Sequence, residues 1–600
     1  MCIRDSIWRC AVKEEVFDAD GADELLGRLH QVLEEITRRP DEPVIDFTPQ
    51  GISVCGLPAF QHDQGTNIPQ TSLRNDTSSD KHDPHPYNLR AIRQVLAIVS
   101  GTSEDYITDD MSIFHTGLDS ISAIKVSSLL RKKGIVVSVG EMLRAGTVVN
   151  MARVVDAFSS HESENSEDHI AVLRATTRHL DRSGILRQVS LNDLDAVEII
   201  PVTAGQLYML AMWINTKGSN FCAEFAYTIT GSITFSELQS AWKALVATNP
   251  ILRTMFVATY DPRIPYAQVL VEEEERAPAI LDVTGKTEDR ASQTIEQVET
   301  QQLFVRLLVS QHAETGWDLK LKIHHAVYDG VSLPILIHQL QDLCNGVKVS
   351  SPSSTTFARY IACSHTQSAL ASRKAFWTQY LSGISQHDRL PQPDPPVAYR
   401  TEIFRSQFLP SKPLESTARQ NGLSLHSLFL AACARQYATF ITGNTSKVID
   451  DIVVGMYLAN RSGPFPGIEI AAVPTVNLLP LRIAIPMSRD LIDIARQIQT
   501  DLRRISEPEH ACASLLEIHD WTGVTVDTFV NFLTLPEIRE GEGQAPGITI
   551  TAKNRWVESV SQTVEQDRAE QRGLHDLLEE LRDESVSAAY LVRLSMHLSG

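Results

Sequence analysis

Two adjacent histidines near the middle of the chain are the residues best suited to chemistry. They end an alternating apolar segment, Leu319–His325, and Asp329 and Gly330 follow within five residues. Because side chains in a strand alternate between faces, His325 should share the apolar face and His324 the face of the lysines. A buried imidazole loses solvation of its charged form and stays neutral near pH 7, so it can accept a proton. We therefore expect His325 to be an inward-facing base.

Other roles remain open for these residues. A lone histidine on an apolar face is more often a satisfied core residue than a catalyst. A metal site is less expected, because neighbouring side chains on a strand point in opposite directions and no other His, Cys or Asp cluster supplies further ligands. Asp329 enters a turn at Gly330, close enough in sequence to brace the loop that follows.

Ser120 is a second candidate, at the predicted start of a helix that follows an acidic loop and the turn Gly117–Asp119. Backbone N–H groups at a helix N-terminus favour a neighbouring phosphate, and an exposed hydroxyl there could carry a flexible tether. An ordinary N-cap serine is the simplest alternative. A hydrolase nucleophile is disfavoured, because that motif requires glycine two residues later, where this chain has Ser122.

The length and composition require several domains around these residues. Six hundred residues exceed what one core holds, and 43% hydrophobic with 21% charged residues is typical of globular chains. The formal net charge of −20 argues against nucleic-acid binding. The eight cysteines form no CxxC pair, and no apolar stretch is long enough for a secretory signal or a membrane span. We therefore expect a cytoplasmic protein.

Composition divides the chain into five segments. Two polar stretches, 61–86 and 159–188, predict linkers. Between them, 87–158 has helical patterns and is large enough for a small all-α bundle. Strands and helices alternate irregularly over 189–600, which indicates an α/β fold with a mixed sheet. The segment 1–60 contains an amphipathic helix that needs a partner surface, which suggests the tail of a domain whose body lies upstream.

The string from His324 to Ser332 resembles the HHxxxDG signature of condensation domains in nonribosomal peptide synthetases. Four further strings resemble motifs of the same family, in the family's order: Pro201–Tyr208, Asn249–Phe256, Asp451–Arg461 and Val473–Arg482. The resemblance implies a two-lobed fold like that of chloramphenicol acetyltransferase, with lobes at about 189–370 and 371–600 and a tunnel between them. The completeness of the second lobe is left open. The segment 1–60 resembles the C-terminal tail of a preceding condensation domain.

The same resemblance assigns roles to the histidine segment. It implies that His325 deprotonates or orients the acceptor amine, that His324 is supportive, and that Asp329 fixes the loop. Gly330 would let the backbone pass close to the substrate. Cyclisation domains carry aspartate in place of the first histidine, and epimerisation domains usually carry tryptophan where this chain has Leu333 after the motif serine. Formation of an amide or ester bond is therefore favoured.

The string Gly117–Ile121 resembles carrier proteins, in which the matching serine bears 4′-phosphopantetheine. We expect this covalent cofactor on Ser120, with Leu118 and Asp119 beside it, and no metal. A carrier followed directly by a condensation domain resembles the tandem ends of fungal ferrichrome-type hydroxamate siderophore synthetases.

The implied partners are upstream adenylation and condensation domains, other carrier domains, a phosphopantetheinyl transferase, and aminoacyl or peptidyl thioester substrates. Two alternatives are a non-catalytic carrier-docking module and a coenzyme A-dependent acyltransferase of the same fold.

Overall fold

A computed structural model of the chain describes most of the three units expected from the sequence. The described residues are 5–13, 27–34, 84–118, 120–159, 169–190, 197–215, 221–261, 263–271, 278, 280–284, 304–312, 316–349, 353–384, 402–445, 451–463, 465, 467–486, 489–526, 528–535, 547–553 and 592–599. The linker expected at 61–86 lies mostly outside these residues.

The predicted small all-α unit is present, and we call it the carrier unit. Its elements are α2 (Pro86–Ser100), η1 (Glu104–Tyr106), η2 (Ile113–Thr116), α3 (Ser120–Lys132), α4 (Val139–Ala145) and α5 (Val148–Ser159). Their apolar faces meet in one core that includes Ile92, Val126 and Met151. Helix α4 begins with a capping box, in which Ser138 and Glu141 satisfy each other's backbone N–H groups.

The first lobe contains a five-stranded sheet, ordered β13-β3-β8-β7-β6, and a three-stranded sheet, ordered β2-β5-β4. Its strands are β2 (Val197–Pro201), β3 (Cys222–Thr230), β4 (Thr254–Asp261), β5 (Ile264–Val271), β6 (Ile280–Asp282), β7 (Val305–His312) and β8 (Gly316–His324). Its helices are α6 (His169–Thr177), α7 (Arg182–Gln188), α8 (Ala204–Asn215), α9 (Phe235–Thr248), η3 (Pro250–Arg253), α11 (Ser332–Cys344) and α12 (Ser353–Ser364).

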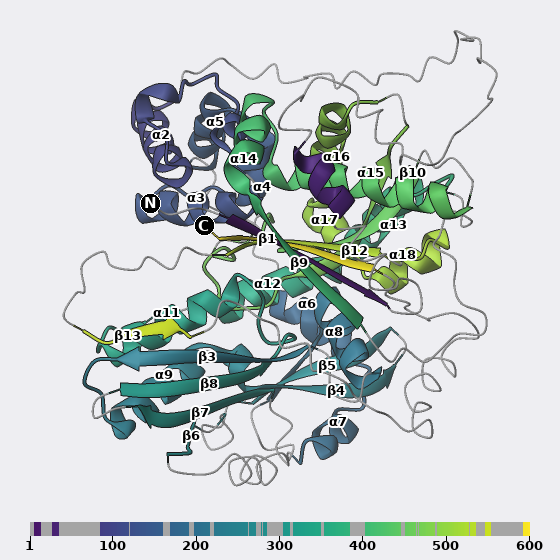
Figure 1. The fold of residues 1–600 in the computed structure, drawn as a ribbon. Coiled ribbons are helices and arrows are strands. Elements are labelled where there is room, and N and C mark those ends of the chain that lie inside the picture. The colour runs from purple at the N-terminus through teal and green to yellow at the C-terminus, as the bar shows by residue number, and fades with distance from the viewer. Residues whose placement is uncertain are drawn as a thin grey trace, which may run out of the picture.

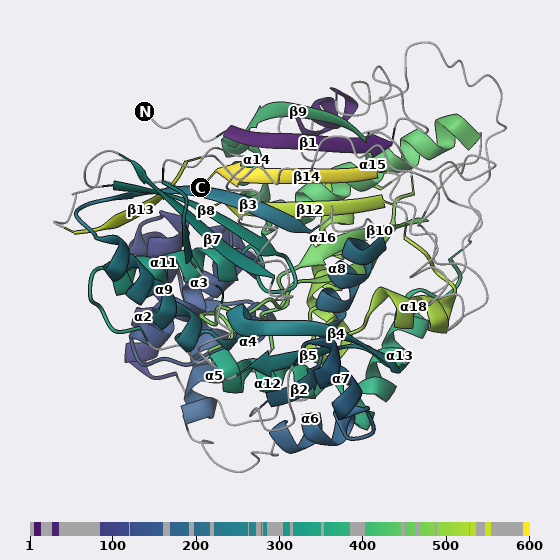
Figure 2. The ribbon, with the colours of Figure 1, turned by 90° about the horizontal axis from the view of Figure 1, so that it is seen from below.

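The second lobe is built on a six-stranded sheet, ordered β11-β10-β12-β14-β1-β9. Figure 2 shows β9, β1, β14 and β12 side by side. Its strands are β1 (Asp5–Lys13), β9 (Glu402–Pro410), β10 (Asp451–Leu458), β11 (Asn477–Ala484), β12 (Thr528–Leu535) and β14 (Val592–Ser599). Its helices are α13 (Gln367–Tyr380), α14 (Ser411–Gln420), α15 (Leu425–Thr445), α16 (Leu491–Ile505), α17 (Pro508–Ala511) and α18 (Leu515–Thr522). Parallel and antiparallel pairs occur together, as the expected mixed sheet requires.

The ends of the chain differ from the expected segmentation. Strand β1 pairs with β14 and β9, and the helix at residues 27–34 buries Leu29 and Leu33 in the core of the second lobe. The described parts of 1–60 therefore lie in the second lobe of this same chain. Strand β13 (Thr549–Ala552), assigned from sequence to the second lobe, pairs instead with β3 of the first.

The second expected linker is also partly structured. Residues 169–188 of the stretch 159–188 form α6 and α7, which pack on the first lobe through Leu173, Ile185 and Leu186. These few buried apolar residues are enough to hold short helices on an existing core. Figure 1 shows the carrier unit beside α14 of the second lobe, with the first lobe below.

Candidate active site

His324 is the buried imidazole of the pair, which corrects the expectation that His325 would be. Strand β8 exposes Lys320 and Lys322 on the face that His324 shares, yet His324 is fully buried. The cause is local cover, because the rings of Trp213 and Phe304 lie 5.4 Å and 4.7 Å from its ring centroid. Alternation predicts the face of a side chain correctly, but the packing at the strand end decides its burial.

The buried ring of His324 is held neutral and has a structural contact. Its Nδ1 accepts a hydrogen bond from the backbone N–H of Ala326 at 3.0 Å, which shapes the turn after the strand. Burial, and to a smaller extent the neighbouring His325, lowers the pKa of His324 to about 3. His324 is therefore a neutral acceptor at physiological pH and does not exchange protons there.

His325 lies just beyond the strand and remains partly exposed. Its ring stacks on Tyr328 at 4.5 Å and meets Phe221 edge-on at 6.1 Å, and Phe221 in turn contacts Tyr208. Its backbone N–H donates to the carbonyl of Phe221 at 2.7 Å. Within the described part of the chain, the shielded Nδ1 of His325 has no hydrogen-bond partner. The aromatic rings thus set the orientation of the imidazole.

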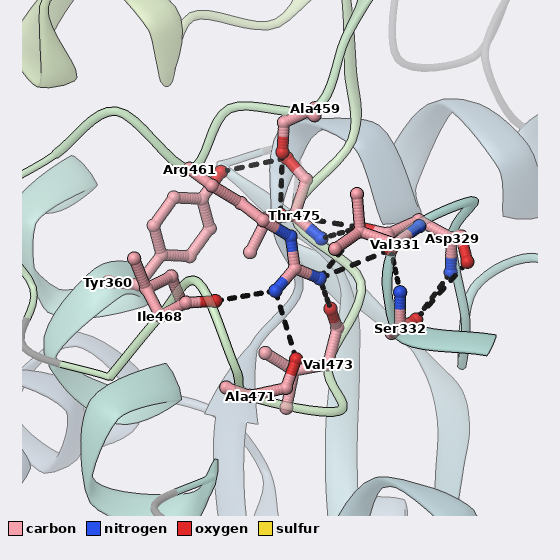
Figure 3. A network of polar contacts seen from close by, with 10 residues as sticks. All are labelled: Asp329, Val331, Ser332, Tyr360, Ala459, Arg461, Ile468, Ala471, Val473 and Thr475. Carbon is pink, nitrogen blue, oxygen red and sulfur yellow. Dashed lines mark hydrogen bonds and ion pairs between the residues drawn. The ribbon is translucent and has the colours of Figure 1, made fainter. Parts of the chain in front are cut away.

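Asp329 is a buried anchor between the lobes, as Figure 3 shows. Its carboxylate accepts from Arg461 Nη2 at 3.1 and 3.2 Å and from the backbone N–H of Thr475 at 2.8 Å. It also accepts from the backbone N–H groups of Val331 and Ser332, which fixes the turn before α11. Asp329 therefore holds the histidine loop of the first lobe against two segments of the second.

Arg461 completes this anchor, and we call the Asp329–Arg461 pair with Thr475 the lobe latch. The buried guanidinium donates to three backbone carbonyls besides Asp329, those of Ile468, Ala471 and Val473. Burial alone would raise the pKa of Asp329, but Arg461 and the N–H donors of Thr475 and Ser332 hold it below its usual value. The carboxylate is thus ionised across the physiological range.

A second network supports the loop from within the first lobe. Gln206 donates to the carbonyl of Ala326 at 2.9 Å and to the side chain of Gln268 at 3.1 Å. Beside it, a Cβ added at Gly205 would lie 1.9 Å from the backbone oxygen of Val476, so only glycine permits this approach between the lobes. In the string Pro201–Tyr208, the glycine and the glutamine therefore occupy positions that support the histidine loop.

A pocket of about 410 Å³, within the usual size of ligand sites, shares walls with both networks. Gln268 and Val473 belong to its lining. Gly330, the remaining candidate residue of the histidine loop, lies exposed in the turn before α11. Its expected closeness to a substrate stays a prediction.

The carrier unit places its candidate serine where the sequence predicts it. Gly117 adopts a left-handed conformation with φ of 82° and ends η2, and α3 begins at Ser120. Leu118 is buried in the carrier core, whereas Asp119 lies outside the described residues. Burial of Leu118 in the carrier core thus fixes the turn, and Ser120 is the first residue of a 13-residue helix.

Arg461, Thr475 and Gln206 lie inside the motif strings found in the sequence, but no role was predicted for any of them. An arginine in a turn that directly follows an apolar strand is the signal that could have marked Arg461 as a buried partner for Asp329. Among the described residues, no cluster of three or more His, Cys, Asp or Glu could hold a metal ion. Across the same residues, no helix is both long and apolar enough to cross a membrane.

Comparisons with known proteins match both parts of the chain. A family model for condensation domains matches residues 197–520, and one for the phosphopantetheine attachment site matches 90–155. The chain is 44% identical to nonribosomal peptide synthetase 2 of Cochliobolus heterostrophus over 529 residues, which is 88% of this chain and 10% of that protein. It is 33% identical to nonribosomal peptide synthetase 2 of Gibberella zeae, over 91% of this chain and 11% of that protein.

A more distant relative is the hydroxamate-type ferrichrome siderophore peptide synthetase of Schizosaccharomyces pombe, 27% identical over 73% of this chain and 8% of that protein. The chain thus spans about a tenth of the length of these relatives. Among solved structures, the first condensation domain of the calcium-dependent antibiotic synthetase is similar with a TM-score of 0.42 and 16% identity, over 59% of this chain and 84% of that chain.

Breaking the lobe latch should destabilise the condensation lobes. Asp329→Asn leaves Arg461 buried without a counter-ion, at a cost of about 3–5 kcal/mol, so calorimetry should show a lower unfolding midpoint. Arg461→Gln should be comparably harmful. The double variant should lose less than the sum of the two, because both charges leave together. Arg174→Gln, which breaks an exposed ion pair with Glu198, is the control and should change little. Strictly additive losses would contradict a coupled latch.

Acid should destabilise the fold in a window set by the buried histidines. The unfolded chain binds a proton at His324 below pH 6.5, whereas the folded chain resists it down to about pH 3, so stability is lost as pH falls. This residue can contribute about 1.4 kcal/mol per pH unit. Burial lowers the pKa of His365 and His426 to about 4, which adds to the slope in the same direction.

Denaturant midpoints measured from pH 7.5 to pH 4.5 would follow this loss. His324→Asn, which can still accept from the N–H of Ala326, should flatten the profile, and the exposed His338→Asn should not. An unchanged profile in His324→Asn would show that this imidazole is protonated in the folded chain.

Proposed function

Because the chain belongs to the condensation-domain family of nonribosomal peptide synthetases and carries a phosphopantetheine attachment site, we propose that it joins two thioester-bound building blocks. The bond formed is an amide or an ester between a donor acyl group and an acceptor amine or hydroxyl. The observation that carries this proposal is the state of His325: oriented by aromatic rings, partly exposed, and without a protein partner on Nδ1.

The carrier unit has the features that a covalent phosphopantetheine arm requires. A glycine turn ends η2 shortly before α3, and the N-terminus of this 13-residue helix, at Ser120, is a position that favours the arm's phosphate. The group supplies a flexible thiol that carries an acyl building block as a thioester. The protein's own contribution is a rigid support, because Leu118 anchors the turn in the carrier core.

His325 would act as the proton acceptor of the condensation step. Nδ1 is enclosed, so Nε2 is the nitrogen left to meet a reactant. As the acceptor nitrogen attacks the donor carbonyl carbon, its proton passes to the imidazole, the carbon–sulfur bond breaks, and the proton leaves with the thiol. Holding both thioesters at one place supplies a further part of the rate through effective concentration.

The remaining residues of the motif would position this imidazole. His324 and Gln206 hold the backbone of Ala326 from two sides, and the lobe latch ties Asp329 to the second lobe. Gly330 would leave space for the substrate beside the turn. None of these groups needs to exchange a proton, which agrees with a neutral His324 and an ionised Asp329.

We assign the substrates to hydroxamate siderophore building blocks on the names of the relatives, among them a ferrichrome siderophore peptide synthetase. The partners would be adenylation and condensation domains, further carrier domains and a phosphopantetheinyl transferase. The cysteines of the described residues form no disulfide, which fits a reducing, cytoplasmic setting.

Incubation with coenzyme A and a phosphopantetheinyl transferase should add a single phosphopantetheine mass to the intact chain. Ser120→Ala should remove this gain, since Ser120 is the serine of the carrier motif and the first residue of α3. Ser122→Ala, which changes a hydroxyl of the same helix, is the control and should be modified normally. Intact-protein mass spectrometry reads out all three, and an unmodified wild-type chain would exclude the carrier role.

His325→Ala should reduce condensation by about 10²- to 10⁴-fold, the usual contribution of a general base. The chain loaded at Ser120 is mixed with an acceptor carrier, and the dipeptidyl product is measured by mass spectrometry. The exposed His338→Asn is the matched control. Equal product from wild type and His325→Ala would favour a module that only docks carriers. Equal turnover of a coenzyme A thioester by Ser120→Ala would favour a freestanding acyltransferase.

A further inference from the structure

The carrier unit contacts the condensation lobes at several points, and one of them can discriminate between carriers. We propose that Glu469 of the second lobe is a specificity-determining residue that selects its carrier by pairing with a basic residue at the position of Arg131. The inference rests on the proposed function for its purpose, although the contact itself can be tested without any condensation reaction. The partner it fits is a carrier helix with a cation three turns beyond the attachment serine.

The Arg131–Glu469 pair is short and largely removed from water. Arg131 Nε lies 2.5 Å from Glu469 Oε1, and the two side chains are 28% and 4% exposed. A carrier without a cation at this position would cover the carboxylate of Glu469 and leave it without a partner, which disfavours docking. The contact therefore discriminates chiefly by rejecting wrong carriers. The other ion pair of this interface, Arg144–Glu507, is more exposed and contributes less to selection.

Contacts at the opposite end of α3 hold the attachment site. The guanidinium carbon of Arg503 lies 4.4 Å from the ring centroid of Phe114, and a Cβ added at Gly117 would lie 2.8 Å from Arg419 Nε. Ser120 and Arg131 are separated by about 16 Å along the helix at 1.5 Å per residue. Contacts near both ends of α3 fix the direction of this helix, which a contact at one end alone would not do.

The docked carrier also touches both chain segments joined by the lobe latch. The N–H of Gly140 donates to the carbonyl of Ser462 at 2.9 Å, and Ser462 follows Arg461 directly. Val331, two residues after Asp329, packs with Ala459 against the carrier core. A carrier that pairs with Glu469 is therefore docked at the loop that bears His325. A carrier that does not form this pair would not reach that loop.

Gly140 provides an independent test of the same docked position of the carrier unit. A Cβ at this position would lie 2.3 Å from the backbone oxygen of Ser462, so alanine cannot be accommodated in the docked carrier. Within the carrier alone, Gly140 lies in the first turn of α4, where alanine is the better helix former by about 0.5–1 kcal/mol. Gly140→Ala should thus weaken docking while leaving the carrier folded.

The test uses the full chain labelled at Ser120 with a fluorescent coenzyme A derivative by a phosphopantetheinyl transferase. A docked carrier tumbles with the whole chain and gives high fluorescence anisotropy, and a released carrier gives lower anisotropy. Arg131→Glu, Glu469→Arg and Gly140→Ala should each lower it. The charge exchange Arg131→Glu with Glu469→Arg should restore most of the loss. Arg153→Glu, which reverses an exposed carrier arginine that donates to Asn150 of its own helix at 3.0 Å, is the control and should change nothing.

Hydrogen exchange on the unlabelled chain gives the same readout if labelling fails. The amide of Gly140 should be protected in the wild type, exchange faster in either single charge reversal, and regain protection in the double variant. Single reversals that leave anisotropy and protection unchanged, or a double variant as impaired as the singles, would overturn the proposal. Restored docking without any condensation product would instead refute the proposed function and leave the carrier-selecting contact standing.

Discussion

The ion pair between Asp329 and Arg461 is the interaction on which the site depends. It joins a loop of the first lobe to two loops of the second in a place from which water is excluded. A buried pair of this kind contributes little net stability compared with an apolar contact, yet breaking one half of it is costly. Its value lies in geometry, because the loop that carries His325 can take up only the position in which both charges are satisfied.

The residues of the loop that carries His325 therefore have different roles. Asp329 and His324 are buried and keep fixed protonation states, whereas His325 alone retains both access and an unengaged nitrogen. Aromatic rings orient it without forming a hydrogen bond that would compete with a reactant. Neighbours in sequence can thus have opposite roles because one lies under Trp213 and Phe304 and the other lies at the opening of the turn.

Much of this arrangement could be predicted from sequence, and the failures have definite physical causes. Periodicity and motif strings predicted the helices, the mixed sheet, the start of α3 at Ser120 and the bracing role of Asp329. The burial of His324 depends on two rings from distant elements, which a strand pattern does not contain. The partner of Asp329 lies 132 residues away, so only the folded chain identifies it. Helices α6 and α7 were taken for a linker because their stability comes from docking on the first lobe and not from local pattern.

Strand β13 has a consequence for how the protein is made. It covers the edge of β3, and Thr549 and Thr230, which pair across this contact, are 319 residues apart. At the usual rates of synthesis, roughly 15–60 s pass between the emergence of the two partners from the ribosome. During that interval the nascent first lobe presents an uncapped sheet edge, which is the kind of surface that recruits other chains. Pairing of β13 with β3 therefore closes this edge only after residue 549 has been synthesised.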